Sequence, residues 1–160
     1  MIEINIGEDV IKKAEIKANK MGILRNSIMQ GKGNIVGFLG EEIVKNYINA
    51  EESNTYDYDL IKKGIKIDVK TKKTKVKPLP HYEASVTNPN QKCDVYAFVR
   101  ILSNYSKAYI CGWLFKKDYY AKATLLKKGQ VDRTNNWKVK EDCYNVPYKN
   151  LKQFKEKKCQ

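Results

Sequence analysis

The sequence predicts a single α/β domain, spanning residues 1–160, in which a central mixed β-sheet is flanked by helices. Two early stretches have helical apolar periodicity, an alternating pair of segments around a tight turn follows them, and two continuous apolar runs come next. This order of elements is typical of a sheet covered by helices. One core is sufficient, because a domain of about 150 residues buries roughly two thirds of its unfolded surface.

The first predicted helix extends from Gly7 to Lys20, where apolar residues recur at helical spacing among exposed lysines. Residues 25–33 contain Gly31-Lys32-Gly33 and are predicted to form a flexible loop. Asn34 can then cap a second helix that continues to Ile48. This second helix has the strongest apolar pattern in the sequence.

A β-hairpin is predicted from Tyr56–Ile61 and Ile65–Thr71, with Lys63-Gly64 as its turn. In this register Leu60 faces Ile67, and Asp59 therefore lies opposite Asp68. Because side chains alternate, two faces result. The predicted solvent face carries Asp57, Asp59, Asp68, Lys70 and Lys72, and the predicted core face carries Tyr58, Leu60, Ile67, Val69 and Thr71.

The remaining elements follow from proline positions and apolar runs. Residues 72–92 contain Pro78, Pro80 and Pro89 and are predicted to form a long loop or basic arm. The later predictions are buried strands at Asp94–Leu102 and Ala108–Phe115, a short helix at Lys116–Thr124, an edge strand at Tyr144–Pro147 and a basic C-terminal helix at residues 148–158.

The charge balance favours a polyanionic partner. The formal net charge is +13, from 31 Lys plus Arg against 18 Asp plus Glu. Nucleic acid is the first expectation and an anionic membrane surface the second. Lysines greatly outnumber arginines, and lysine contacts phosphate as a point charge, so backbone binding is favoured over base reading.

Several other classes of site and location are disfavoured. The cysteines form no CxxC pair and His81 is the single histidine, so a zinc site lacks ligands. No secretory signal and no apolar run of about 20 residues is present, so we expect a cytoplasmic, intracellular protein with free thiols and no membrane partner. Cys93 and Cys111 are expected to pack as small hydrophobes.

The opposed carboxylates of the hairpin are the candidate site. Asp59 and Asp68 repel each other across the strands, and a hard divalent cation would relieve that repulsion. Asp59, Asp68 and the Val69 carbonyl would offer Mg2+ an open site, and Lys70 could position or deprotonate the attacking water. The alternative is a solvated strand face with an Asp57–Lys70 ion pair.

Three segments carry a resemblance to a known family. They are Gly40-Glu41-Glu42 in the second helix, Tyr58-Asp59, and Ile67-Asp68-Val69-Lys70-Thr71. Their order resembles the PD-(D/E)XK nuclease superfamily over residues 34–115, with Tyr58 in place of the eponymous proline. The resemblance implies a restriction-endonuclease-like core.

The resemblance also implies hydrolysis of DNA with Mg2+, for which Mn2+ can substitute. Asp59 and Asp68 would hold the metal, Lys70 would assist the water, and a helix glutamate would complete the shell. Glu41 is preferred over Glu42 because its helical neighbours are apolar, although an exposed, merely solvated glutamate is the alternative.

The predicted function is therefore a Mg2+-dependent endonuclease, with branched or otherwise structured DNA among the expected substrates. The resemblance suggests a homodimer and an origin in a phage or another mobile element. The rivals are a catalytically silent DNA-binding or phage-assembly module and a protein-binding inhibitor. Lysines 70, 72, 73, 75 and 77 form a basic track, and Tyr82, Tyr119, Tyr120 and Trp137 could stack on bases or pack in the core.

Overall fold

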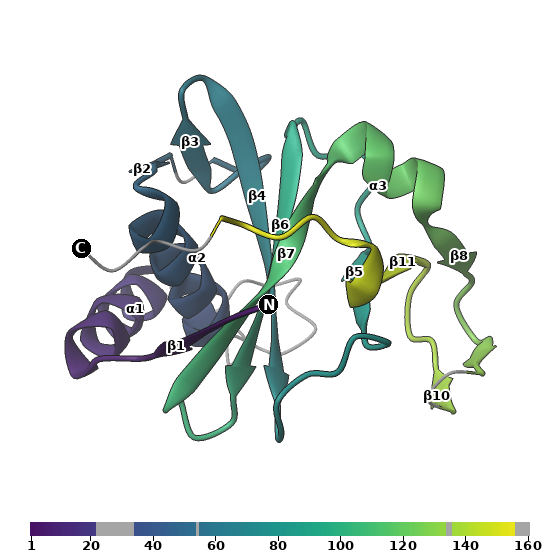
Figure 1. Ribbon diagram of the computed structural model, residues 1–160, viewed down its shortest axis with the longest axis horizontal. Coiled ribbons are helices and arrows are strands. Elements are labelled where there is room, and N and C mark those ends of the chain that lie inside the picture. Colours follow the sequence, from purple (N-terminus) through teal and green to yellow (C-terminus); the bar gives the residue numbers. More distant parts are fainter. Residues whose placement is uncertain (22–33, 54, 134–135, 156–160) are drawn as a thin grey trace.

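The computed structural model describes residues 1–21, 34–53, 55–133 and 136–155 (Figure 1). The predicted loop at residues 25–33 lies outside this range. The elements are β1 (Ile2–Asn5), α1 (Glu8–Met21), α2 (Asn34–Ile48), β2 (Glu51–Glu52), β3 (Leu60–Lys62), β4 (Ile65–Thr74), β5 (Glu83–Val86), β6 (Val95–Leu102), β7 (Lys107–Phe115), α3 (Lys116–Lys122), β8 (Thr124–Leu126), β9 (Val131–Asp132), β10 (Trp137–Lys138), β11 (Cys143–Pro147) and a 3-10 turn at Tyr148–Asn150.

In the described part of the chain, six strands form one mixed sheet in the order β1-β7-β6-β4-β3-β2. β4 and β6 run parallel, while the other neighbours are antiparallel. Helices α1 and α2 cover one face (Figure 1), where Leu39 and Val44 pack with Val69 and Val99. The predicted α/β class, with a central mixed sheet flanked by helices, is confirmed.

A second layer lies against the other face of the sheet. Among the described residues, β5, β11 and β8 form a three-stranded sheet, which packs with α3 around Tyr96, Phe98 and Tyr119. Two predictions are therefore wrong. Residues 72–92 include the end of β4 and all of β5, and the predicted edge strand β11 is the middle strand of this sheet.

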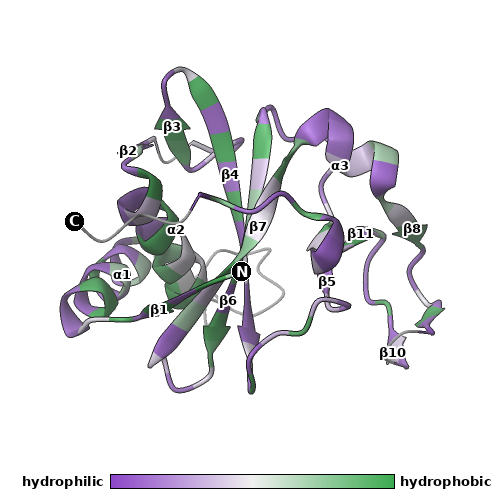
Figure 2. Cartoon of the chain, in the orientation of Figure 1, coloured by the Kyte–Doolittle hydropathy of each residue, from purple (hydrophilic) through white to green (hydrophobic). Residues whose placement is uncertain are grey.

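The hairpin register is confirmed. Leu60 pairs with Ile67 and Lys62 with Ile65, across a turn in which Lys63 and Gly64 both have positive φ, at 50° and 79°. Figure 2 shows the alternating hydropathy along β4. Leu60, Ile67 and Val69 lie in the core, as predicted. The predicted solvent face is wrong, because both faces of β4 are covered and Asp68 is buried with 4% of its surface exposed.

Helix α2 approaches β4 closely at Gly40. A Cβ atom at this position would lie 1.9 Å from Thr71 Oγ1 and 2.9 Å from Thr71 Cβ. Glycine therefore sets the distance between the helix and the strand that carries Asp68 and Lys70.

The predicted C-terminal helix at residues 148–158 is wrong over its described part. After the 3-10 turn the chain runs extended past β7, where Trp113 and Lys152 exchange backbone hydrogen bonds of 2.9 and 3.0 Å. Phe154 then contacts Tyr47 of α2, with ring centroids 6.2 Å apart. These contacts with the sheet and α2 outweigh the helical pattern of the segment.

Cys93 and Cys111 are both buried in the apolar cluster beneath the second layer, as predicted. No helix within the described residues is long and apolar enough to span a membrane.

Candidate active site

The candidate site lies where β3 separates from β4. The paired part of β3 begins at Leu60, so β4 has an open edge beyond Ile67. Asp59 fills this gap: its backbone N–H donates to the Ile67 carbonyl at 3.0 Å, and its Oδ2 accepts the Val69 N–H at 2.7 Å. A residue in a strand directs its N–H and C=O to the same side, so the Val69 carbonyl also faces Asp59.

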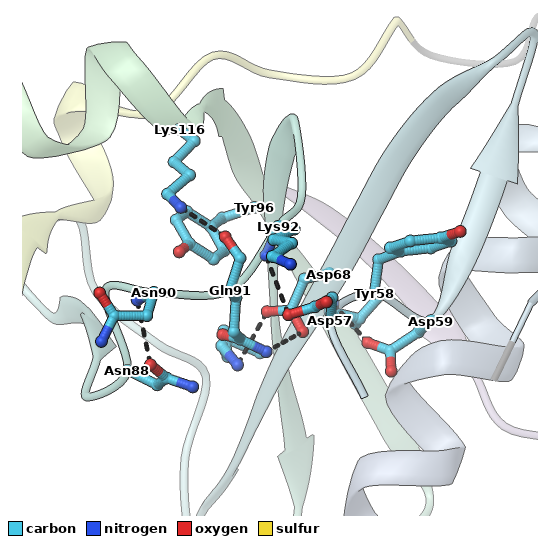
Figure 3. A network of polar contacts seen from close by, with 12 residues as sticks. Asp57, Tyr58, Asp59, Asp68, Asn88, Asn90, Gln91, Lys92, Tyr96 and Lys116 are labelled. Atoms are coloured by element: carbon cyan, nitrogen blue, oxygen red, sulfur yellow. Dashed lines mark hydrogen bonds and ion pairs between the residues drawn. The ribbon is translucent and has the colours of Figure 1, made fainter. Parts of the chain in front are cut away.

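The Asp68 side chain lies on the face of β4 opposite Val69 and the helices, and two residues contact its carboxylate. Its Oδ1 accepts a hydrogen bond from Gln91 Nε2 at 2.9 Å (Figure 3), and its Oδ2 forms an ion pair with Lys70 Nζ at 2.8 Å. This buried Oδ2 has no directed hydrogen bond among the described residues. Burial raises the pKa of Asp68, against the opposing attraction of Lys70.

Asp57 does not pair with Lys70, so the simple ion-paired strand face is wrong. The Asp57 Oδ1 accepts the backbone N–H of Lys92 at 3.1 Å, and the Asp57 charge contributes to the raised pKa of Asp68. Figure 3 shows Asp57, Asp59 and Asp68 gathered at this part of the sheet. The negative charges of these carboxylates are thus close enough to repel one another.

Glu41 of α2 belongs electrostatically to this cluster. Burial and the negative charge of Asp59 raise the pKa of Glu41 to about 8. Burial and the charge of Asp68 raise the pKa of Asp59 to about 6, although the Val69 N–H opposes the shift. Three carboxyl groups, from α2, β4 and the segment before β3, therefore have raised pKa values that result from burial and from the negative charges nearby.

Glu42 faces a different neighbourhood. With 2% of its side chain exposed, it forms ion pairs with Lys45 and, at 2.8 Å, with Lys17 of α1. Burial opposes ionisation, but these lysines hold the pKa of Glu42 below its ordinary value. The position of Glu42 is that of a structural ion pair between the helices, whereas Glu41 is the helix acid near Asp59.

The donor set suits a hard divalent cation. Asp59, Asp68 and the Val69 carbonyl are all oxygen donors, and the buried Asp68 Oδ2 has the Lys70 ammonium at 2.8 Å but no further hydrogen bond among the described residues. No group of three or more His, Cys, Asp or Glu side chains in the described ranges is arranged to hold a metal ion unaided. A cation here would therefore need the backbone oxygen, water or a phosphate to complete its shell.

Lys70 connects the acidic cluster to a cavity of about 600 Å3 between the two layers. Lys72 and Arg100 also line it. Arg100 donates through Nη2 to the Glu83 carbonyl at 3.3 Å and lies over the Tyr148 ring, which ties β6 to the second layer. Lys72 is partly open to solvent, but desolvation by the protein around it, together with the positive charge of Arg100, lowers its pKa to about 8.

The sequence did not indicate several residues of this region. Gln91 lies in the segment predicted to be a loop, and Glu83, Asp132 and Asn145 are brought to the cavity by the second layer. Of the proposed stacking residues, Tyr119 is buried in the core, while Trp137 is 58% exposed and lines the cavity.

Comparison with known proteins does not identify a family. No protein-family model matches the chain, and none of the curated proteins searched matches it.

Proposed function

We propose that this protein is a Mg2+-dependent endonuclease that hydrolyses DNA phosphodiester bonds, with a site of the PD-(D/E)XK kind. The observation that carries the proposal is the convergence of Asp59, Asp68 and Glu41 beside Lys70, on a protein with a net charge of +13. Buried, mutually repelling carboxylates are costly in a protein that has no use for them.

Asp59, Asp68 and the Val69 carbonyl would hold the cation, with Glu41 at its outer side. Bound there, Mg2+ would supply charge neutralisation at the phosphate and activation of water. Asp59 is already fixed by the Val69 N–H, and Asp68 by Gln91, so little reorganisation is needed on binding.

Lys70 is the residue that we expect to contact the scissile phosphate. Its ammonium lies 2.8 Å from Asp68 Oδ2, and Lys70 is also one of the residues that line the cavity. When Asp68 is engaged by the cation, Lys70 can turn its charge to the phosphate oxygen or orient the attacking water. The water oxygen would form a P–O bond as the bridging P–O bond breaks; the attacking water would lose one proton to solvent, and the departing sugar oxygen would take one proton up from solvent.

The test is cleavage of linear duplex, single-stranded, branched and supercoiled DNA with Mg2+ or Mn2+. Asp68→Asn and Lys70→Ala should each reduce the cleavage rate by about 100-fold or more. Lys66→Ala is the matched control: it removes the same charge from the same strand, but Lys66 lies outside the basic track and is exposed over the Tyr58 ring. We expect this variant to cut within about 3-fold of wild type.

Far-UV circular dichroism and thermal unfolding should show that all three variants are folded. If the wild type cuts no substrate yet binds DNA, and neither site variant changes that binding, the nuclease proposal is wrong. The catalytically silent DNA-binding module would then be the better description. Sedimentation of the free and DNA-bound protein would test the proposed homodimer.

A further inference from the structure

The cavity between the layers is lined by carboxyl, amide and aromatic groups that phosphate binding alone would not require. Its volume of about 600 Å3 is within the usual range for small-molecule sites. Lys70 and Lys72 of β4 line it together with groups from β5, the β9–β10 hairpin and β11. One wall is thus shared with the candidate active site, while the other walls belong to the second layer.

Hydrogen-bond acceptors are built into the second-layer walls. Asn145 is 5% exposed, and its Nδ2 donates to Glu83 Oε2 at 2.9 Å. This bond leaves Asn145 Oδ1 as a buried acceptor with no partner among the described residues. An unpaired buried polar atom is costly, so a group that donates to it would bind favourably.

The neighbouring carboxyl groups extend this acceptor surface. Asp132 is 6% exposed and also lines the cavity. Burial, followed by the charge and hydrogen bond of Asp132, raises the pKa of Glu83. Carboxylates repel phosphate, but they accept hydrogen bonds from base amino groups.

Trp137 provides the remaining feature at the cavity wall. Its indole is 58% exposed and has the Lys140 ammonium 5.4 Å from the ring centroid. Exposed aromatic rings bind unpaired bases by stacking. Cations on β4, an aromatic ring on β10 and acceptors on β5, β9 and β11 together match the parts of one nucleotide.

We propose that this cavity takes one unpaired nucleobase with an exocyclic amino group, displaced from a DNA strand whose phosphate lies at Lys70. The inference rests on the proposed function for the identity of the strand, and it narrows the substrate to DNA with unpaired nucleotides. A paired base cannot enter, because its hydrogen-bonding edge is occupied inside the duplex. Thymine is disfavoured, since it presents a carbonyl where cytosine presents its amino group.

The experiment measures binding without catalysis. Fluorescence anisotropy in EDTA would compare duplexes that carry a single-nucleotide bulge of cytosine, thymine or an abasic residue with the fully paired duplex. We expect the wild type to bind the cytosine bulge about 10-fold more tightly than the thymine or abasic bulge. Equal affinity for the three bulges would overturn the proposal.

Two variants locate the effect. Asn145→Ala should remove the preference for cytosine over thymine, and Trp137→Ala should weaken binding of the cytosine bulge by about 10-fold while leaving the thymine bulge, the abasic bulge and the paired duplex unchanged. Tyr56→Ala is the matched control, because Tyr56 is 87% exposed and lies outside the cavity lining. Wild-type base preference in both cavity variants would overturn the assignment.

Asn145 lies in the middle strand of the second sheet, so its substitution requires a folding check by circular dichroism. If Asn145→Ala does not fold, Trp137→Ala at the surface still decides the question. Failure of the nuclease proposal is distinguishable, because it appears as absent metal-dependent cutting, whereas this proposal fails through absent base discrimination in EDTA.

Discussion

At the scale of single residues, Glu41 and Glu42 are neighbours with opposite electrostatic environments. Glu41 has an ordinary pKa of 4.5 that rises to about 8 in the folded protein. The folded state therefore holds a proton that the unfolded state loses across this range. The resulting contribution to stability is complete below pH 4.5 and is lost as the pH rises through about 8.

The stability of the Glu41→Gln variant, compared with that of the wild type, should consequently increase with rising pH. In metal-free buffer, we expect the free energy of unfolding of this variant, relative to wild type, to increase by on the order of 2 kcal/mol between about pH 5 and about pH 9, after allowance for solvent screening. Urea denaturation at a series of pH values would measure it.

Glu42→Gln is the control with the opposite sign. The pKa of Glu42 is lowered, so its stabilising contribution is present above the unfolded pKa and is lost in acid. This variant should be less stable than wild type at neutral pH, and the difference should shrink as the pH falls. Parallel pH profiles for the two variants would contradict the assignment of Glu41 to the acidic cluster.

The convergence of Asp59, Asp68 and Lys70 was predictable because the Lys63-Gly64 turn fixes the hairpin register. The partners of these residues were not. Gln91 reaches the site through a segment without a periodic pattern, and Asp57 accepts the Lys92 N–H instead of pairing with Lys70. Local sequence therefore places the charged groups on β4 but does not indicate which groups bind them.

At the scale of elements, the contact between α2 and β4 depends on a glycine. Gly40→Ala would drive a methyl group into Thr71, so we expect a loss of about 1–3 kcal/mol in the free energy of unfolding. A shifted helix would also move Glu41, and cleavage should fall with stability. Chemical denaturation and cleavage assays on the same preparation would measure both effects.

Gly37→Ala supplies the comparison within the same helix. A Cβ at Gly37 meets no atom within 4 Å, and alanine has the higher helix propensity. This variant should gain about 0.5–1 kcal/mol. If both substitutions were equally neutral, close packing at Gly40 would not be what positions the helix.

The long, periodic elements were the predictable ones. Helices α1 and α2, the β3–β4 hairpin, and strands β6 and β7 follow from apolar spacing. β5 was missed because the prolines around it suggested an irregular segment, although Pro78 and Pro80 precede the strand and Pro89 follows it. β1 was missed because its Ile2 and Ile4 alternation is too short to be distinctive without its partner β7.

At the scale of the whole molecule, the excess of lysine predicts salt-sensitive DNA binding. The logarithm of the affinity should fall linearly with the logarithm of salt concentration. Lys72 and Lys140 line the cavity, and replacing both with alanine should reduce the steepness of this line by about 1 for each phosphate that is no longer neutralised.

The control replaces Lys12 and Lys13 with alanine. Both are exposed on α1, which packs on the face of the sheet opposite the second layer. Anisotropy titrations at several salt concentrations should give a line close to that of wild type. If this variant reduced the steepness as much as the cavity variant does, the DNA path would not follow the cavity.

The second layer marks the limit of what the sequence could predict about the whole molecule. Alternation along β4 assigns Asp68 and Lys70 to one face, but it cannot say whether that face meets water or another sheet. The covering strands β5, β8 and β11 come from distant parts of the chain. Their stacking turns a strand surface into a walled cavity.

The pairing of β1 with β7 has a consequence for folding during synthesis. Ile2 comes far earlier in the sequence than its partner Ile110, and Trp113 pairs with Lys152, which follows β11. On the ribosome, β1 therefore emerges long before the strand it joins. Contacts so distant in sequence make folding slow relative to a helical bundle of equal size, and leave the β7 edge at Trp113 unpaired until the segment around Lys152 has been synthesised.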